Sequence, residues 1–562
     1  MRRATAVVLT LAAFLCAGFA APHRVEYTLT PQLEGGALRA VAVEIAFTGD
    51  MDGETLLRLP NSWGGQEELW RSVQDLRVIS GARLQDGDGP AQRLLLHRPG
   101  ARIRVHYRVV QDWRGAPSAS LGNTYRPAIQ PNYFHLIGEA ALATPELDAA
   151  TPARLQVRNL PRGWRFASDL EHEGLTLGDV LSSVSVGGDF RVVRSPDGHV
   201  RLAIRGDWSF ADENFAAEIA GIVEAQRAFW SDPAFPYLVT VLQLEAPNPG
   251  WRSIGGTGLG DAFAFFATPN ADASTITRML AHESFHTWIP GRVGGFAEGE
   301  TAQRLEYWFS EGMTDFYAPR MLVRQGAWGP AEFAADLNAA LDAYARSPVS
   351  TATNAELAEH FWSNAEMHQL PYRRGRLLAT LWDYRLRASG GSLDQVMRAM
   401  RARAAEDAGV SAGAMFPEAA RQAGLDVAAD MGTYVDAGAW IRLPEDTFAP
   451  CGRIVTRQTP PFHRGFDIEA TSANGNVIAG VDRASPAYAA GLRDGMVLLA
   501  REGGQIGDAE QEIVYRVRDG ETERVLRYLP RGPGEITVQR LELHADLSGA
   551  QLAACRTILS GD

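Results

Sequence analysis

Two histidines and a glutamate form the most informative short motif of the chain. His282, Glu283 and His286 are spaced as His-Glu-x-x-His. On a helix, side chains four residues apart lie on one face, so both imidazoles can bind one metal ion while Glu283 stands beside it. Imidazoles are common zinc ligands, and a carboxylate next to a zinc-bound water is suited to act as a general base. The motif therefore predicts a hydrolytic zinc centre.

A third ligand is expected from residues 307–315, because a catalytic zinc takes three protein ligands and keeps one open position. This segment contains Glu311, and Asp315 follows four residues later. Asp315 is thus placed to accept the outer N–H of a ligating histidine and to fix its tautomer. Alternatively, Glu311 and Asp315 form a solvated helix edge. The aromatic neighbours favour a buried position instead: Trp308, Phe309, Phe316 and Tyr317.

The elements around these motifs are expected to be mostly helical. Apolar residues recur at helical spacing from 275 to about 438, with helical windows beginning near Pro330, Asn354, Tyr372 and Leu393. Upstream, residues 237–242 read as a strand. A glycine-rich bend at 255–261 then leads into a second apolar strand at 262–266. These features predict an α-rich domain that carries the metal centre.

The N-terminal region is expected to be built from β-strands. From 23 to about 205, apolar residues alternate with polar ones, as in Val41, Val43, Ile45 and Phe47, and a period of two indicates half-buried strands. Turn-forming clusters separate these runs at 86–90 and 195–198. We therefore expect a β-sandwich-like region here, and the β pattern returns after Cys451.

Length and charge narrow the classes of function. The chain has 562 residues, so we expect several domains. Its 46% hydrophobic and 22% charged residues are typical of soluble globular proteins. Asp and Glu (67) exceed Lys and Arg (54), and the net charge of −13 repels a phosphate backbone. We therefore expect no nucleic-acid partner.

The first residues have the pattern of a secretory signal peptide. Two arginines at positions 2 and 3 precede a short apolar run, and small residues end it near Ala20. Residues 1–20 are thus predicted to be cleaved, giving an exported protein, periplasmic or secreted, with no transmembrane helix in the mature chain. Cys451 and Cys555 then remain, and in an oxidising compartment they either pair or stay free.

The two metal motifs together resemble a known family. H-E-x-x-H-T-W at 282–288, followed by W-F-S-E-G-x-T at 308–314, resembles the glycyl aminopeptidase-like zinc metallopeptidases, metallopeptidase family 61 of the gluzincin type. The resemblance implies a multi-domain α+β protein. Its expected parts are a β-sandwich-like N-terminal domain (21–210), a thermolysin-like α-rich zinc peptidase domain (211–445) and a C-terminal PDZ domain (455–547).

The resemblance also implies roles for individual residues. His282, His286 and Glu311 become the ligands of one catalytic zinc ion, and Glu283 the general base. Pro-Tyr-Arg-Arg-Gly at 371–375 resembles the P-Y-x-K-G segment of related aminopeptidases, whose tyrosine stabilises the oxyanion, so Tyr372 is the candidate for that role. His360 and His368 are alternative donors.

The substrate-binding strand departs from the family pattern. Members of the family carry G-G-L-E-H before this strand, and its glutamate suits the free amine of a substrate. The corresponding residues here are Gly258, Leu259, Gly260 and Asp261, which we expect to bind substrate without that glutamate. The amine partner is then Asp261 at a shifted register, or an acidic residue between the two motifs: Glu298, Glu300 or Glu306.

Residues 477–498 resemble the strand–helix–turn–strand stretch of PDZ domains, which bind an extended peptide, often a C-terminus. Residues 464–468 correspond to the loop that meets the peptide carboxylate, although Asp467 is unfavourable there. The module either binds a peptide C-terminus or acts as a structural spacer.

Three hypotheses for function follow. The first is an exported zinc peptidase, an aminopeptidase acting on short peptides with a metal-activated water and Glu283 as general base. The second is an endopeptidase-like variant, which the missing glutamate favours. The third is a non-catalytic envelope scaffold that presents its PDZ domain. A scaffold needs no base beside an open metal site, so Glu283 favours an enzyme.

Overall fold

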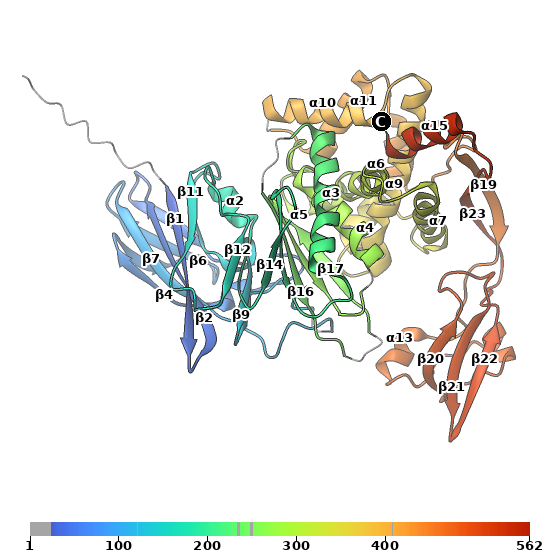
Figure 1. The fold of residues 1–562 in the computed structure, drawn as a ribbon, viewed down its shortest axis with the longest axis horizontal. Coiled ribbons are helices and arrows are strands. Elements are labelled where there is room, and N and C mark those ends of the chain that lie inside the picture. Colours follow the sequence, from blue (N-terminus) through green and yellow to red (C-terminus); the bar gives the residue numbers. More distant parts are fainter. Residues whose placement is uncertain are drawn as a thin grey trace, which may run out of the picture. The chain divides into compact units, whose positions relative to one another are not determined.

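The computed structural model describes residues 24–120, 122–232, 236–247, 251–271, 273–406 and 409–561. The signal peptide predicted for residues 1–20 lies outside them. The contacts divide the chain into two units. The first contains the residues up to 115 together with 125–189, and the second contains 116–124 and everything from 190 onward. Figure 1 labels strands and helices of both units.

The first unit is β-rich, as the sequence predicts. Its five-stranded sheet has the order β11-β1-β2-β7-β4, with bounds β1 (Val25–Glu34), β2 (Ala37–Thr48), β4 (Val73–Ser80), β7 (Arg102–Val109) and β11 (Ala153–Val157). A four-stranded sheet has the order β10-β3-β6-β5, with β3 (Glu54–Arg58), β5 (Ala82–Asp86), β6 (Gln92–His97) and β10 (Thr144–Pro145). A second has the order β12-β13-β9-β8, with β8 (Ala128–Gln130), β9 (Tyr133–Ile137), β12 (Arg165–Ser168) and β13 (Val184–Gly188).

Alternation along the strands creates the core of this unit. On β7, the side chains of Ile103, Val105 and Tyr107 are buried, while Arg102 and Arg104 between them are exposed. The buried side chains join residues of all three sheets in one apolar cluster. The described residues of this unit also form three short helices: η1 (Leu69–Ser72), α1 (Gly138–Ala141) and α2 (Leu177–Leu181).

Two strands before residue 210 belong to the second unit, so the boundary at 210 expected from the sequence differs from the contact boundary at 189–190. β14 (Arg191–Arg194) pairs with β15 (Val200–Arg205), and β15 runs parallel to β16 (Tyr237–Gln243). Period-two alternation identifies a strand but does not say which sheet the strand joins. That is why the sequence placed these strands with the N-terminal region.

The second unit begins with a five-stranded sheet in the order β14-β15-β16-β18-β17. β18 (Ala262–Ala267) is buried along its whole length and runs parallel to β16. β17 (Ile254–Gly258) pairs antiparallel with β18 and is the last strand in the order. α3 (Asp212–Trp230) packs its apolar side, including Phe215 and Ile219, onto this sheet.

The helices that follow form the largest core of the molecule. They are α4 (Ala273–Glu283), η2 (Ser284–Thr287), α5 (Glu300–Leu305), α6 (Tyr307–Arg324), α7 (Pro330–Arg346), α8 (Asn354–His360), α9 (Ala365–Ala388), α10 (Leu393–Glu406), α11 (Ala412–Gln422), α12 (Ala428–Asp430) and η3 (Met431–Asp436). α7, α8 and α10 begin where the sequence predicts. α9 begins earlier than Tyr372, because Asn364 accepts hydrogen bonds from the backbone N–H groups of Glu366 and Met367 and caps the helix.

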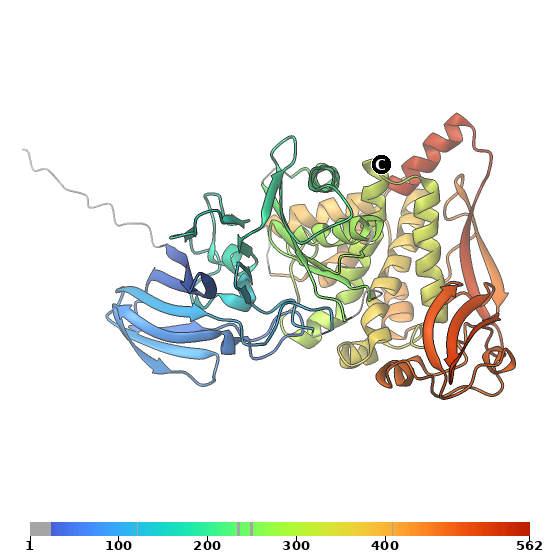
Figure 2. The same cartoon turned by 60° about the horizontal axis from the view of Figure 1, so that its bottom comes forward.

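The strands after residue 451 rejoin the helical core. β19 (Gly452–Thr459) and β23 (Ile536–Leu543) pair antiparallel. Asn338 of α7 exchanges two hydrogen bonds with the backbone of Leu541, at 2.7 and 3.0 Å. Figure 2, turned by 60°, shows this orange-red strand pair beside the yellow-green helices.

A small module is inserted between β19 and β23. It contains α13 (Ile468–Ala473), α14 (Pro486–Ala489), β20 (Val497–Gly503), β21 (Ile513–Asp519) and β22 (Thr522–Tyr528). The three strands form their own sheet, and Phe466, Ile478 and Tyr515 lie in a separate apolar core. The predicted PDZ range of 455–547 therefore includes this module and, at both ends, strand residues paired outside it.

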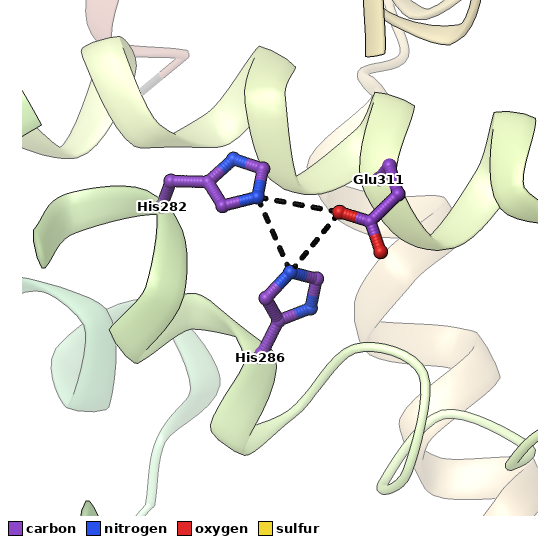
Figure 3. A group of neighbouring side chains, drawn as sticks. All are labelled: His282, His286 and Glu311. Atoms are coloured by element: carbon purple, nitrogen blue, oxygen red, sulfur yellow. Dashed lines mark hydrogen bonds and ion pairs between the residues drawn. The ribbon is translucent and has the colours of Figure 1, made fainter. Parts of the chain in front are cut away.

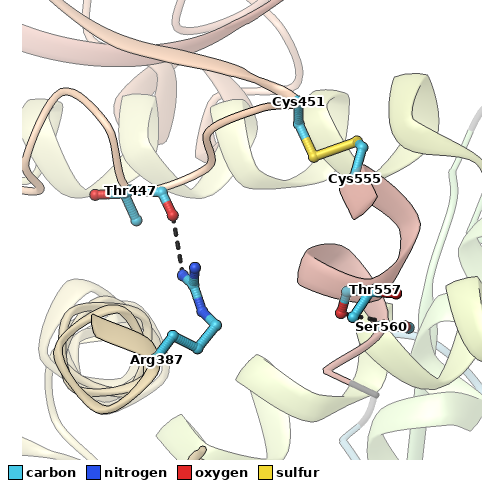
Figure 4. The surroundings of a disulfide bond; sticks show 6 residues. All are labelled: Arg387, Thr447, Cys451, Cys555, Thr557 and Ser560. Carbon is cyan, nitrogen blue, oxygen red and sulfur yellow. Dashed lines mark hydrogen bonds between the residues drawn. A yellow bond between two sulfur atoms is a disulfide. The ribbon is translucent and has the colours of Figure 1, made fainter. Parts of the chain in front are cut away.

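The last helix, α15 (Gly549–Ser560), is tied to the helical core. A disulfide joins Cys451 to Cys555 (Figure 4). Arg324 of α6 donates hydrogen bonds to the backbone carbonyls of Ser560 and Gly561, at 2.7 and 2.9 Å. Of the two states that the sequence left open for these cysteines, the structure has the paired one. None of the described helices combines the length and apolar character needed to cross a membrane.

Candidate metal centre

Three side chains converge on one point (Figure 3). The Nε2 atoms of His282 and His286 are 3.2 Å apart, and each is 3.4 Å from Oε2 of Glu311. His282 lies near the end of α4 and His286 lies in η2, so the single helix expected for the motif tightens into a 3₁₀ turn after Glu283. Glu311 comes from α6.

The spacing of these atoms suits a zinc ion. Ligand atoms about 2.0–2.1 Å from a tetrahedral zinc are separated from one another by roughly 3.3 Å. The three distances of 3.2, 3.4 and 3.4 Å match three corners of such a tetrahedron. The donor set of two imidazoles and one carboxylate also suits zinc, and the fourth corner is left for water or substrate.

A polar partner on the outer side of each imidazole, a carbonyl oxygen for His286 and a carboxylate for His282, orients both Nε2 atoms toward that point. Nδ1 of His286 is 2.9 Å from the carbonyl oxygen of Ile289 and donates its proton there. Nδ1 of His282 faces Oδ1 of Asp315 at 3.4 Å. A proton on Nδ1 leaves the Nε2 lone pair free for a metal. Asp315 is thus placed where the sequence predicts.

Asp315 belongs to a ring of four charges that connects four helices. Arg278 of α4 lies 2.6 Å from Asp315 and 3.1 Å from Asp336 of α7. Arg376 of α9 lies 2.6 Å from Asp336 and 3.6 Å from Asp315. Sequence reasoning missed Arg278, Asp336 and Arg376. Arg278 precedes His282 by one helical turn, and this spacing could have identified it. No local pattern in the sequence indicates Asp336 or Arg376.

Glu283 contacts the edge strand β17. The backbone N–H of Gly258 donates a hydrogen bond to Oε2 of Glu283 at 3.2 Å. A Cβ on Gly258 would lie only 2.7 Å from the carbonyl oxygen of Glu283 and 3.1 Å from Cβ of His286. Glycine is therefore required for the strand to approach the metal centre this closely.

Tyr372 of α9 lies on another side of the metal centre. Its ring stacks against that of His282, with centroids 5.7 Å apart. Of the alternative donors, His368 lies beside Tyr372 in a tilted ring contact with centroids 6.1 Å apart, and His360 is exposed at the end of α8. The structure thus brings the ring of Tyr372 against a candidate ligand, whereas no described hydrogen bond or ring contact joins either histidine to the three ligand residues.

A comparison with known protein families finds a match over the segment that contains these residues. The model of the M61 glycyl aminopeptidase family matches residues 275–372, a stretch that includes His282, Glu283, His286, Glu311 and Tyr372. The family match and the zinc-like spacing of the three ligand atoms both indicate a zinc peptidase. The chain is a zinc metallopeptidase.

A solved structure of low sequence identity shares the fold of this zinc metallopeptidase. An aminopeptidase N family protein from Idiomarina loihiensis has a TM-score of 0.65 at 15% identity, over 95% of this chain and 100% of that one. An M1 zinc metallopeptidase from Deinococcus radiodurans (TM-score 0.46, 16% identity, 75% and 96% covered) and yeast LTA4 hydrolase (0.44, 14%, 75% and 69%) are less similar. The first of these shows that the chain shares the multi-domain α+β fold of that protein. A search among curated protein sequences finds no match.

Burial and charge set the protonation of the metallopeptidase site. Burial opposes ionisation of Glu311, but the two histidines outweigh it and hold the pKa of Glu311 well below its usual value. Burial likewise opposes the charged form of His282, yet its hydrogen bonds with Asp315 and Glu311 raise its pKa to about 9 when no metal is bound. Burial raises the pKa of Glu283, which favours proton uptake by this side chain.

The predicted substrate residues of the metallopeptidase separate into two groups. Gly258 touches Glu283, whereas the carboxylate of Asp261 is 3.4 Å from Arg292 and 3.6 Å from Arg227. Leu259 is buried, and Gly260 lies between it and Asp261.

No described contact joins the alternative acidic residues, Glu298, Glu300 and Glu306, to the metal centre. Glu306 accepts a hydrogen bond from the Ser411 hydroxyl at 2.6 Å. Glu300 is 81% exposed and pairs with Arg304, and Glu298 is exposed. The amine-binding role expected for Asp261 is therefore disfavoured by its two arginine partners, and none of these glutamates gains support for it.

Proposed function

We propose that this zinc metallopeptidase is an exported aminopeptidase that removes N-terminal residues from short peptides. The observation that carries the proposal is the position of Glu283, beside the candidate ligands and in hydrogen-bond contact with β17. Aminopeptidase activity is supported by the family description that matches residues 275–372 and by the aminopeptidase N family protein of similar fold. Export is supported by the pattern of residues 1–20 and agrees with the Cys451–Cys555 disulfide.

Glu283 is assigned the proton transfers. His282, His286 and Glu311 would hold the zinc ion, which when bound would polarise the scissile carbonyl as a Lewis acid and lower the pKa of water. Glu283 takes the proton of the attacking water and passes it to the leaving amine. The N–H of Gly258 orients the carboxylate, and the raised pKa of Glu283 suits it to hold that proton between the two steps.

Tyr372 is assigned the stabilisation of the oxyanion. Burial, together with the nearby negative charge of Glu311, raises the pKa of the Tyr372 hydroxyl well above its usual value. The side chain therefore remains protonated and can donate a hydrogen bond to the negatively charged oxygen that forms on the substrate. Its stacking on His282 fixes the ring beside the metal centre.

β17 is assigned the binding of the substrate backbone. It pairs with β18 on one side and is the last strand in the sheet order of the described residues. The N–H and C=O groups of an edge strand can pair with an extended peptide. A peptide bound along β17 lies next to Glu283, because Gly258 ends this strand.

An endopeptidase is the second candidate, and one observation favours it. The carboxylate of Asp261 is engaged by Arg227 and Arg292, so the family's amine-binding glutamate has no replacement at this position. A site without an amine partner accepts chains that extend beyond it.

The inserted module is proposed to be a PDZ-like domain that positions peptide C-termini. Asp467 weakens the case for peptide binding, because it lies within the 464–468 segment. Its carboxylate accepts a hydrogen bond from the N–H of Ala470 at 2.9 Å and caps α13. Asp467 therefore repels a peptide carboxylate, unless the carboxylate binds to the other end of the 464–468 segment. Binding of immobilised peptides with free or amidated C-termini to the full chain tests this.

Digestion of a mixed peptide library, read by mass spectrometry, tests the proposed activity. Release of single N-terminal residues supports the aminopeptidase, and internal cuts support the endopeptidase. The control is Glu283→Gln, which removes the base and keeps the size of the side chain. No cleavage by zinc-loaded protein would contradict both candidates and would leave the scaffold hypothesis.

A further inference from the structure

A cavity of about 680 Å³ lies away from the residues of the metal centre. Its walls come from the end of α3, the loop after η2 and the C-terminal half of α10. The charged side chains in these walls are Arg292, Arg398 and Arg401. Among the described residues, the charged groups of this lining are all cationic, in a chain whose net charge is −13.

Two of these arginines are held in place by one buried carboxylate. Oδ2 of Asp232 lies 3.0 Å from Arg292, and Oδ1 lies 3.2 Å from Arg401. The Asp232 side chain is only 4% exposed, and Trp288 donates its indole N–H to it at 2.6 Å. Because Asp232 is fixed, the guanidinium groups are positioned in advance of any ligand, which lowers the entropic cost of binding.

Arg398 is fixed in a different way. Its Nε donates a hydrogen bond to the carbonyl oxygen of Phe229 at 3.0 Å, and its guanidinium carbon lies 4.9 Å from the centroid of the Phe229 ring. No carboxylate lies within ion-pair distance of Arg398 in the part of the chain that the structure describes. Its positive charge is therefore available for a ligand.

Among the described residues, the positive and negative charges around the cavity do not cancel. Asp232 forms ion pairs with Arg292 and Arg401. A second carboxylate, that of Asp261, forms ion pairs with Arg292 and Arg227. Two of the three guanidinium groups of the lining are thus paired with Asp232 or Asp261, and neither carboxylate reaches Arg398 in the described parts of the chain. The planar N–H groups of arginine match the oxygen atoms of carboxylates and phosphates.

We propose that this cavity binds small organic oxyanions, carboxylates or phosphates that carry an apolar group. The oxyanion contacts Arg398 with Arg292 and Arg401, and the apolar part lies against Trp230 and the alanines of α10. The volume falls within the range of small-molecule sites, about 300–1,000 Å³. This proposal is independent of the peptidase activity.

Isothermal titration calorimetry of the zinc-loaded full chain tests the proposal with three probes. Hippurate carries a carboxylate, phenyl phosphate a phosphate, and hippuramide is the neutral analogue of hippurate. We expect at least one of the two anions to bind in saturable fashion and hippuramide to bind at least tenfold more weakly, because charge-assisted hydrogen bonds to arginine are lost. Comparison of the two anions shows which oxyanion the cavity prefers.

Two charge reversals on α10 locate the binding. Arg398→Glu should weaken anion binding roughly tenfold or more. Arg403→Glu makes the same charge change on the same helix at an exposed position outside the cavity lining, and should leave binding unchanged. Absence of saturable anion binding would overturn the proposal. Equal binding by wild type and Arg398→Glu would also overturn it, because the anion would then be bound elsewhere, as at the metal centre.

Discussion

Gly312 and Gly375 bring two catalytic helices into backbone contact. A Cβ on Gly312 would lie 2.3 Å from the Cα of Gly375, and a Cβ on Gly375 would lie 1.9 Å from the carbonyl oxygen of Trp308. Neither position has room for a larger residue. This contact is what places Glu311 of α6 and Tyr372 of α9 around one point.

Replacement of Gly375 by alanine should therefore separate α6 from α9. We expect a loss of about 1–3 kcal/mol in the free energy of unfolding, the usual cost of overpacking, and weaker zinc binding because Glu311 moves. Denaturant unfolding and zinc titration measure the two effects. Gly391→Ala is the matched control, since a Cβ there meets only ordinary contacts at 3.6 Å. Unchanged stability and zinc affinity in Gly375→Ala would contradict this account of the contact.

Removal of the Tyr372 hydroxyl should slow the chemical step. In Tyr372→Phe the ring can still stack on His282, but the oxyanion loses its hydrogen-bond donor. We expect kcat to fall by roughly 10²–10³, with a smaller change in KM. Steady-state kinetics on a peptide cleaved by the wild type measure this. His368→Phe is the control; a larger loss of kcat in that variant than in Tyr372→Phe would assign the donor role to the histidine instead.

The charge ring behind His282 should support zinc binding through Asp315. Asp336→Asn removes the negative charge that pairs with Arg278 and Arg376. Both arginines also contact Asp315. Changes to the outer partners of zinc ligands typically cost about 10–100-fold in metal affinity, and we expect the lower end here because Asp336 acts through the arginines. Competition with a zinc chelator measures the affinity. Asp342→Asn, on the same helix and paired with Arg540, should have no effect; equal losses in both variants would point to general damage to α7.

Zinc affinity should rise with pH. The pKa of His282 is about 9 without metal, and that of His286 is also raised, although burial opposes both charged forms. His282 therefore holds its second proton near pH 7, and zinc must displace that proton to bind. Chelator competition between pH 6 and 9 should give an apparent affinity that increases steadily up to about pH 9. An affinity independent of pH over this range would show that the histidines are already neutral.

The metal centre was predictable because its signals are short. His282, Glu283 and His286 fall within one helical turn, and the aromatic residues around Glu311 mark a buried helix in the sequence alone. The β-rich first unit and the starts of α7, α8 and α10 were predictable for the same reason, since alternation and helical periodicity are local properties.

Features that depend on distant pairing were not predictable. Asp336 and Arg376 belong to the charge ring only because α7 and α9 pack beside α4 and α6. β15 joins the sheet of the second unit because it pairs with β16, and the arginine cavity forms where three separate segments meet. The engagement of Asp261 by Arg227 and Arg292 is of the same kind. No single sequence window contains these contacts.

The central claim is that zinc bound by His282, His286 and Glu311 works with Glu283 to hydrolyse peptides. The most direct test measures zinc content and peptide cleavage together, in the wild type and in Glu283→Gln. We predict about one zinc per chain in both proteins, with cleavage lower in the variant by roughly 10²–10⁴. Cleavage by Glu283→Gln at the wild-type rate, or cleavage by wild type that carries no zinc, would contradict the account.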